Sequence, residues 1–259
     1  MAKEGEIRYL ENADEETIEY QKGKPFSLPR CAEYLMEIGA VMSLLSEVPG
    51  KVLDLGCGAG WTSRFFAKKG YDVTGVDICA DKIQCAEEVN RKDGLGHLRF
   101  VAGDFESLPF DNEFDCAVFL DSLHHAEDEE AALRVVYRAL KSGGVCITSE
   151  PGRGHSKTPE SVEAREKHNV TERDMPPKMI IRAGRKAGFR KFRVYPHASH
   201  VHAILYGDPD ARFLQGRIKP GLARRCMAWL LGARLLRGLA LLLLVHLSRG
   251  YSGIVVMIK

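Results

Sequence analysis

The 259-residue sequence has no strong excess of either charge, no paired-cysteine motif and no apolar run near residue 1 of the kind that forms the core of a signal peptide. Its formal net charge of +2 gives no general reason to expect nucleic-acid binding, because dedicated binders are usually more basic. The seven cysteines show no CxxC pair or metal-ligand spacing, which favours reduced, buried thiols in a cytosolic protein. The charged N-terminus lacks the apolar core of a signal peptide. These absences predict a cytoplasmic globular protein, long enough for one α/β domain with an insertion.

Three glycines at alternate positions follow a short apolar run in residues 52–60, which read VLDLGCGAG. The apolar run is typical of a strand buried on both faces, as in a parallel sheet. Gly56, Gly58 and Gly60 allow a sharp turn at positive φ and the close approach of a ligand. Residues 61–69 then read as a helix. This order of strand, glycine turn and helix predicts a nucleoside-type ligand at a helix N-terminus.

The details of this turn separate two classes of ligand. No Gly-Lys-Ser/Thr follows the glycines, which excludes a P-loop, and Asp54 just before the turn would repel a pyrophosphate. An acid there suits a ligand that carries a cationic amine. The stretch resembles motif I of the class I S-adenosylmethionine-dependent methyltransferases. The resemblance implies that the glycine turn packs on the methionine part of the cofactor, with Asp54 shaping the turn and facing the amino group.

A second acid stands at the tip of the next predicted strand, residues 71–77. The Asp77 carboxylate can accept hydrogen bonds from both hydroxyls of a ribose, and it lies about 20 residues beyond the turn, as that role expects. The alternative is a helix N-cap, a role that Asp81 fits better. We therefore predict that Asp77 binds ribose.

A third acid follows the strand predicted over residues 97–102. The resemblance implies that Asp104 holds the adenine amino group and that Phe105 packs on the ring, although a simple turn aspartate is the alternative. With the positions that the resemblance adds, the predicted cofactor-binding residues are Asp54, Gly56, Cys57, Gly58, Gly60, Asp77, Ile78, Asp104, Phe105 and Asp121.

Two adjacent histidines follow the fourth predicted strand, residues 116–121. The carboxyl ends of parallel strands line the ligand crevice, so His124 and His125 are expected beside the transferable methyl group. Adjacent side chains are expected to point apart, so that only one histidine faces the substrate as a general base. The alternative is that one packs on the cofactor and the other caps the acidic helix beginning near residue 127.

Glu150 ends the fifth predicted strand, residues 145–149, and is the remaining candidate for acid–base work or for contact with a substrate hydroxyl. The candidate catalytic residues are thus His124, His125 and Glu150. The polar segment 152–177 that follows is rich in basic and histidine residues, so it either binds an anionic substrate or forms a solvated helix.

A metal site is not predicted. His200 and His202 share one face if residues 199–205 are extended, but no carboxylate or cysteine lies near them in the sequence. We expect these histidines to line a pocket or the surface.

The long apolar segment 226–247 contains Arg234 and Arg237 near its centre. Each arginine would cost roughly 2.5–3.5 kcal/mol at the middle of a bilayer, which disfavours a transmembrane helix. Two alternatives remain: burial in the domain or in a homodimer interface, or peripheral contact with a membrane surface.

The sequence as a whole predicts an α/β fold, a Rossmann-like doubly wound sheet of seven strands that is mostly parallel with an antiparallel last strand. Residues 1–48 are expected to form an N-terminal segment that either closes over the cofactor or packs as a tail and one helix. Residues 49–196 and 251–259 are expected to form the cofactor-binding domain, and residues 197–250 a helical, partly hydrophobic insertion before the last strand.

The resemblance implies methyl transfer from S-adenosylmethionine to a small-molecule acceptor. No Asn/Asp-Pro-Pro-Tyr/Phe or Pro-Cys motif follows the fourth strand, which disfavours amino-adenine, glutamine-amide and pyrimidine acceptors. Residues 166–188 resemble bacterial methyltransferases of polysaccharide or glycan assembly, which favours O-methylation of a sugar or glycolipid hydroxyl. The alternatives are N- or C-methylation of another small molecule, including a natural product, and a catalytically silent cofactor-binding regulator.

Overall fold

The computed structural model describes residues 2–11, 13–206, 242–243, 245–246, 248 and 250–259. Its centre is one sheet with the strand order β3-β2-β1-β4-β5-β7-β6. The strands are β1 (Lys51–Leu55), β2 (Asp72–Asp77), β3 (Leu98–Ala102), β4 (Phe114–Leu120), β5 (Leu140–Ser149), β6 (Lys191–Tyr195) and β7 (Ile254–Ile258). Strands β1 to β5 pair in parallel, and β7 is antiparallel to both β5 and β6. The predicted fold class is confirmed.

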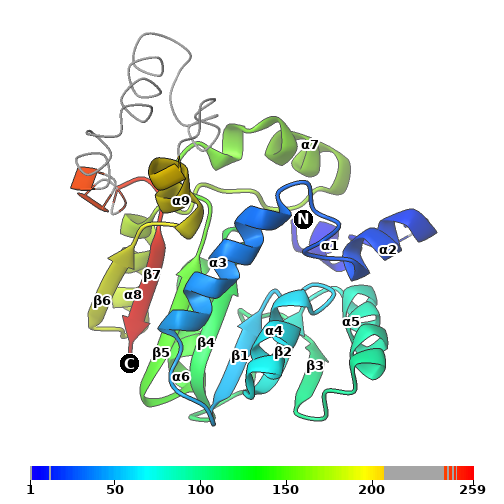
Figure 1. The fold of residues 1–259 in the computed structure, drawn as a ribbon, viewed down its shortest axis with the longest axis horizontal. Coiled ribbons are helices and arrows are strands. Elements are labelled where there is room, and N and C mark those ends of the chain that lie inside the picture. The colour runs from blue at the N-terminus through cyan, green and yellow to red at the C-terminus, as the bar shows by residue number, and fades with distance from the viewer. Residues whose placement is uncertain (1, 12, 207–241, 244, 247, 249) are drawn as a thin grey trace.

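Helices cover both faces of this sheet (Figure 1). The α-helices are α1 (Ala2–Ile7), α2 (Glu15–Lys22), α3 (Cys31–Leu44), α4 (Trp61–Lys69), α5 (Ala80–Asp93), α6 (Glu129–Ala139), α7 (Pro159–His168), α8 (Pro177–Ala187) and α9 (Ala198–Tyr206). Two short 3₁₀ turns are η1 (Leu123–His125) and η2 (His155–Lys157). Helices α3 and α4 pack on one face, α6 and α8 on the other, and α1, α2 and α7 lie over one end of the sheet.

Local sequence signals explain where several helices begin and end. Helix α4 runs between two glycines in the left-handed region, Gly60 at φ 80° and Gly70 at φ 108°. The Asp128 carboxylate accepts hydrogen bonds from two backbone N–H groups in the first turn of α6, so Asp128 caps that helix. These caps fix the helices that flank the carboxyl ends of β1 and β4.

Two apolar clusters hold the layers together. One contains Phe119 and Leu133 and joins the sheet to α6 and α8, and the other contains Ile38 and Phe66 and joins it to α3 and α4. All four side chains are almost fully buried. Because β1 and β4 contribute buried residues to both clusters, they form the rigid centre from which the functional loops project.

The segment after β6 differs from the expectation of an extended chain. Residues 198–206 form helix α9, in which positions two apart point in different directions, so His200 and His202 do not share a face as a strand would allow. His200 is instead buried, with its ring 5.2 Å from that of His197.

The apolar segment 226–247 lies mostly outside the described residues, and the boundaries predicted for the insertion stay a prediction. Among the residues that are described, no helix combines the length and the hydrophobicity needed to cross a bilayer.

Candidate active site

The glycine turn after β1 uses its three glycines for different reasons. Gly56, Gly58 and Gly60 all have positive φ, at 73°, 54° and 80°. A Cβ on Gly56 would lie 2.4 Å from the Cβ of Ser122, and one on Gly60 would lie 2.6 Å from the Phe100 ring. A Cβ on Gly58 would meet nothing within 4 Å. Packing therefore requires two of the glycines, while the third faces open space of the kind that a ligand needs.

This contrast predicts different outcomes for two alanine variants. Gly58→Ala should keep the fold at a cost of about 1–2 kcal/mol for its left-handed backbone, yet its methyl group should weaken cofactor binding. Gly56→Ala should destabilise folding more, since its Cβ overlaps Ser122. Thermal unfolding and calorimetric titration with S-adenosylmethionine measure the two effects. Wild-type affinity in a folded Gly58→Ala protein would contradict the placement of the ligand.

Asp54 lies inside the turn, beneath the start of α4. Its carboxylate accepts hydrogen bonds from the hydroxyls of Thr62, at 2.5 Å, and Ser63, at 2.6 Å. Burial raises the pKa of Asp54 to about 6, although the two hydroxyl donors oppose that shift. Asp54 thus holds the turn to the helix, and its contact with the cofactor amino group stays a prediction.

Asp77 links the end of β2 to the same turn. One carboxylate oxygen accepts a hydrogen bond from the Gly58 N–H at 2.8 Å, and the other accepts from the Cys79 N–H at 3.0 Å. Each oxygen keeps a further lone pair with which to accept from a ribose hydroxyl. The expectation that Asp81 would cap the following helix is wrong, because α5 already begins at Ala80.

Three more predicted cofactor contacts flank these acids. Cys57 is buried in the turn, and Ile78 is half-buried directly after β2. Phe105, after β3, packs edge-on against Phe119 with ring centroids 5.5 Å apart. These side chains border the same end of the sheet, and their contacts with a cofactor stay predictions.

The N-terminal helix α1 reaches the third acid. The Lys3 ammonium lies 2.8 Å from an Asp104 carboxylate oxygen, while the other oxygen accepts from the Glu106 N–H. In this closed arrangement, Lys3 pairs with the group that the resemblance assigns to the adenine amino group.

Removing this lysine charge should therefore tighten cofactor binding. The Lys3–Asp104 pair is partly exposed and contributes at most about 1 kcal/mol, so Lys3→Met should raise affinity up to about fivefold. Lys22→Met is the matched control, because Lys22 pairs with Glu88 on α5 instead. Calorimetry at low salt measures both variants. If Lys3→Met and Lys22→Met bind the cofactor with the same affinity, Lys3 does not compete with the cofactor.

Side chains of the N-terminal segment and of α5 also approach the site, and none of them is among the predicted cofactor-binding or catalytic residues. The Tyr34 hydroxyl donates a hydrogen bond of 3.0 Å to Asp121, which has φ of 56° just after β4. The Asp121 charge is the main cause of a raised Tyr34 pKa. The Lys82 ammonium lies 4.2 Å from the Tyr9 ring centroid. Burial, and then the nearby Lys82 charge, lower the pKa of Lys24 to about 8.

The two histidines after β4 lie side by side. Their ring centroids are 4.1 Å apart with an interplanar angle of 39°, so the expectation that His124 and His125 point apart is wrong. They belong to the 3₁₀ turn η1, whose geometry differs from the alternation of a strand. Burial lowers the pKa of His125, but the hydrogen bond and charge of Glu6 outweigh it and raise that pKa to about 9.

Glu150 lies beneath this turn with 1 % of its surface exposed. Its carboxylate accepts hydrogen bonds from the backbone N–H groups of Ser122, Leu123 and His124 and lies 2.8 Å from the His124 Nδ1. All these partners belong to the protein itself, and direct acid–base or substrate contact by Glu150 stays a prediction. Glu150 is a positioning residue for His124.

Much of the basic and histidine density in segment 152–177 makes internal contacts. The His155 Nε2 lies 2.6 Å from a Glu172 carboxylate oxygen, Arg165 donates to the backbone carbonyls of Glu172 and Ser156, and Lys167 pairs with Glu163. The same Glu172 oxygen lies 3.6 Å from the His124 Nε2. The loop before α8 thus completes a histidine–carboxylate cluster whose members are far apart in the sequence.

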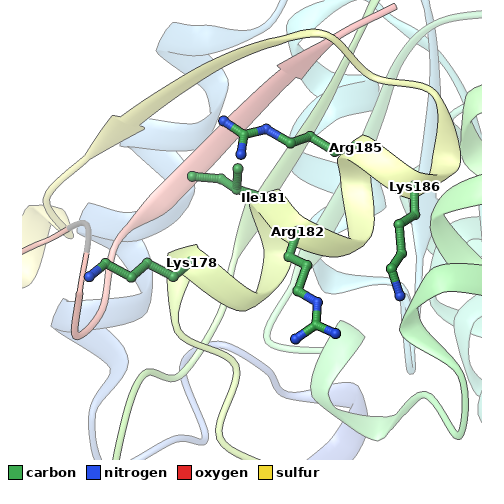
Figure 2. Close-up of a pocket in the computed structure, with 5 residues that line it drawn as sticks. All are labelled: Lys178, Ile181, Arg182, Arg185 and Lys186. Carbon is green, nitrogen blue, oxygen red and sulfur yellow. The ribbon is translucent and has the colours of Figure 1, made fainter.

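A separate surface hollow of about 550 Å³ lies on α8. It is lined by Lys178, Ile181, Arg182, Arg185 and Lys186, none of which is a predicted site residue. Figure 2 shows that these side chains fan out from a single helix and do not converge on one point. The candidate site therefore stays at the carboxyl ends of β1, β2 and β4, where the sequence predicts it.

A family model described as a methyltransferase domain matches residues 53–148, which extend from β1 into β5. This range includes every predicted cofactor contact, from Asp54 to Asp121. The chain contains a methyltransferase domain. Its cofactor is S-adenosylmethionine.

Known proteins that are similar to this methyltransferase domain carry names that indicate different substrates. Squalene methyltransferase 1 of Botryococcus braunii is 39 % identical over 127 residues, which are 48 % of this chain and 34 % of that protein. Sterol 24-C-methyltransferase erg6 of Aspergillus fumigatus is 34 % identical over 131 residues, 49 % of this chain and 33 % of that protein. The chain thus matches about a third of the length of these relatives.

A solved structure extends the similarity of the fold beyond the methyltransferase domain. Phosphoethanolamine N-methyltransferase 2 of Haemonchus contortus, bound to phosphomonomethylethanolamine and S-adenosylhomocysteine, has a TM-score of 0.66 and 18 % identity. The alignment covers 98 % of this chain and 60 % of that one. At this identity the likeness concerns the fold alone.

Proposed function

We propose that the protein transfers the methyl group of S-adenosylmethionine to a hydroxyl of a small molecule, a sugar or glycolipid in the first instance. The observation that carries this proposal is the imidazole pair of His124 and His125 directly after Asp121, at the carboxyl end of β4. In class I folds of this kind, the ends of the parallel strands line the ligand crevice. A general base is useful there when the acceptor must lose a proton.

The reaction is an in-line displacement at the sulfonium methyl group. The acceptor oxygen forms a bond to the methyl carbon as the carbon–sulfur bond breaks, and the electron pair leaves on the sulfur of S-adenosylhomocysteine. The hydroxyl proton passes to His124, because the raised pKa of His125 keeps that second ring protonated near neutral pH. Orientation of the two reactants supplies most of the rate, so closure of α1 and α2 over the site supports the proposal.

A second candidate follows from the names of the relatives. Squalene and sterol methyltransferases transfer the methyl group to carbon, which supports an isoprenoid lipid as the alternative acceptor. The same cluster would then remove a proton after methylation. A catalytically silent regulator would bind the cofactor without producing S-adenosylhomocysteine.

Turnover separates these candidates. The tag-free protein is incubated with S-adenosylmethionine and a panel of sugar, lipid-linked sugar, sterol and small amine acceptors, and S-adenosylhomocysteine and methylated product are measured by mass spectrometry. A methyl ether on a sugar or glycolipid supports the first proposal. A carbon-methylated lipid supports the second, and no product with any acceptor would support the regulator.

Variants of the histidine pair test whether His124 or His125 takes part in catalysis as the general base. His124→Ala and His125→Ala should differ from each other in rate, and loss of the base should lower kcat by about 10²–10⁴-fold. His97→Ala is the control, because His97 is exposed at the start of β3, at the opposite end of the sheet. Two variants with wild-type kcat would remove the histidines from the mechanism.

A further inference from the structure

We propose that His124, His125 and Glu172 bind a divalent transition-metal ion of the zinc type beside the methyl-transfer site. One potential ligand atom from each of these three side chains lies within 4.8 Å of the other two. The two histidines come from η1 and the carboxylate comes from the loop between α7 and α8, so only the folded chain assembles the set.

The two imidazoles are oriented as metal ligands usually are. The His124 Nδ1 lies 2.8 Å from the Glu150 carboxylate, and the His125 Nδ1 lies 2.7 Å from the Thr171 carbonyl oxygen. Both acceptors favour the tautomer with the proton on Nδ1, which leaves the Nε2 lone pair for a metal ion. Metal-binding histidines characteristically donate their other ring nitrogen to a carboxylate or a backbone carbonyl in this way.

The distance between His124 and Glu172 suits a metal ion shared by the two side chains better than a direct hydrogen bond. The His124 Nε2 lies 3.6 Å from the Glu172 carboxylate oxygen, too far for a good hydrogen bond. Ligand atoms of a tetrahedral zinc site, with bonds of 2.0–2.1 Å, lie about 3.3–3.4 Å apart. The separations in the set exceed that spacing by at most about 1.4 Å, which small side-chain rotations can close.

The surrounding charges also favour a cation. Glu6, Glu150 and Glu172 converge on the cluster, and among the described residues no lysine or arginine nitrogen lies within 4 Å of their carboxylates. His155 holds the Glu172 oxygen at 2.6 Å and so fixes its direction. The basic partners of these carboxylates among the described residues are histidines, and the two that would bind the ion do so as neutral imidazoles, which leaves negative charge for a divalent ion to neutralise.

The ligand types define the class of metal and its use. Two imidazoles and one carboxylate suit Zn²⁺ or a similar first-row ion, whereas Mg²⁺ and Ca²⁺ prefer oxygen ligands. Three protein ligands leave an open position, as in catalytic zinc sites. This use rests on the proposed function: with both Nε2 atoms bound to the ion, the ion would replace the imidazole base, and an acceptor hydroxyl bound at the open position would lose its proton to solvent before its oxygen attacks the methyl group.

Metal titration tests the inference without any need for activity. The full-length, tag-free protein is freed of metal with a chelator and titrated with Co²⁺, followed by visible absorption, and with Zn²⁺, followed by calorimetry. We expect one ion per chain and a Co²⁺ spectrum of low coordination number. Glu172→Gln and His125→Ala should each weaken the affinity at least tenfold, whereas the control His97→Ala should leave it unchanged.

Each outcome has a definite meaning. A folded wild-type protein that binds neither ion overturns the inference, as does binding that survives both ligand variants in folded form. The chelated protein is also assayed for cofactor binding and turnover, which separates the two proposals. Turnover by the metal-free protein refutes the use of the ion in catalysis and leaves methyl transfer standing, whereas metal binding without turnover refutes only the proposed function.

Discussion

Asp77→Ala should weaken binding of S-adenosylmethionine at least about tenfold, which corresponds to about 1.4 kcal/mol. The variant removes a carboxylate that binds the Gly58 and Cys79 N–H groups and has lone pairs left for a ribose diol. Hydrogen bonds to a charged acceptor contribute about 1.5–3 kcal/mol each, so even one lost ribose contact reaches the expected change. Calorimetric titration measures the affinity.

The control for this variant is Asp81→Ala, which removes an exposed acid in the first turn of α5. It should leave the affinity unchanged. Because Asp77 also holds the glycine turn, thermal unfolding of both variants must accompany the titration. A folded Asp77→Ala protein with wild-type affinity would contradict the ribose assignment.

Glu150→Ala should lower the free energy of unfolding by about 3 kcal/mol or more, since each buried N–H left without an acceptor costs about 1–3 kcal/mol. The carboxylate accepts from three consecutive backbone N–H groups and lies beside the His124 ring. For a chain of this size the melting temperature should fall by roughly 6–12 °C. Circular dichroism during heating measures the change.

Two further variants sharpen this test. Glu160→Ala removes an exposed carboxylate at the start of α7 and should change stability by less than about 0.5 kcal/mol. Glu150→Gln keeps one oxygen for the Ser122 and Leu123 N–H groups, so its free energy of unfolding should lie between those of Glu150→Ala and Glu160→Ala. A Glu150→Ala protein as stable as wild type would refute the positioning role.

Much of the fold could be predicted from local sequence. The sequence predicts a helix over residues 61–69 and a strand over residues 71–77, and α4 and β2 match these bounds within one residue. Strands buried on both faces are continuous apolar runs, and glycines mark the ends of their helices, so both signals lie within a few residues. The segment after Pro196 gave no such signal, and packing of α9 against α3 decided its helical form.

The candidate site was predictable only where it follows a strand. Asp77, Asp121 and the histidine pair stand at strand ends, and the rule about carboxyl ends of parallel strands places them together. Glu172 and Tyr34 could not be found in this way, because tertiary packing alone brings their elements to the same place. The sequence places Glu150 at a strand end, but it does not show that its carboxylate is buried beneath the histidine turn.

The most direct test of the central claim is calorimetric titration of the tag-free protein with S-adenosylmethionine and S-adenosylhomocysteine. The glycine turn, Asp77 and the match to a methyltransferase domain predict one site per chain for both ligands, with dissociation constants on the order of micromolar. A folded protein that binds neither ligand would contradict this account of the site and leave only the fold.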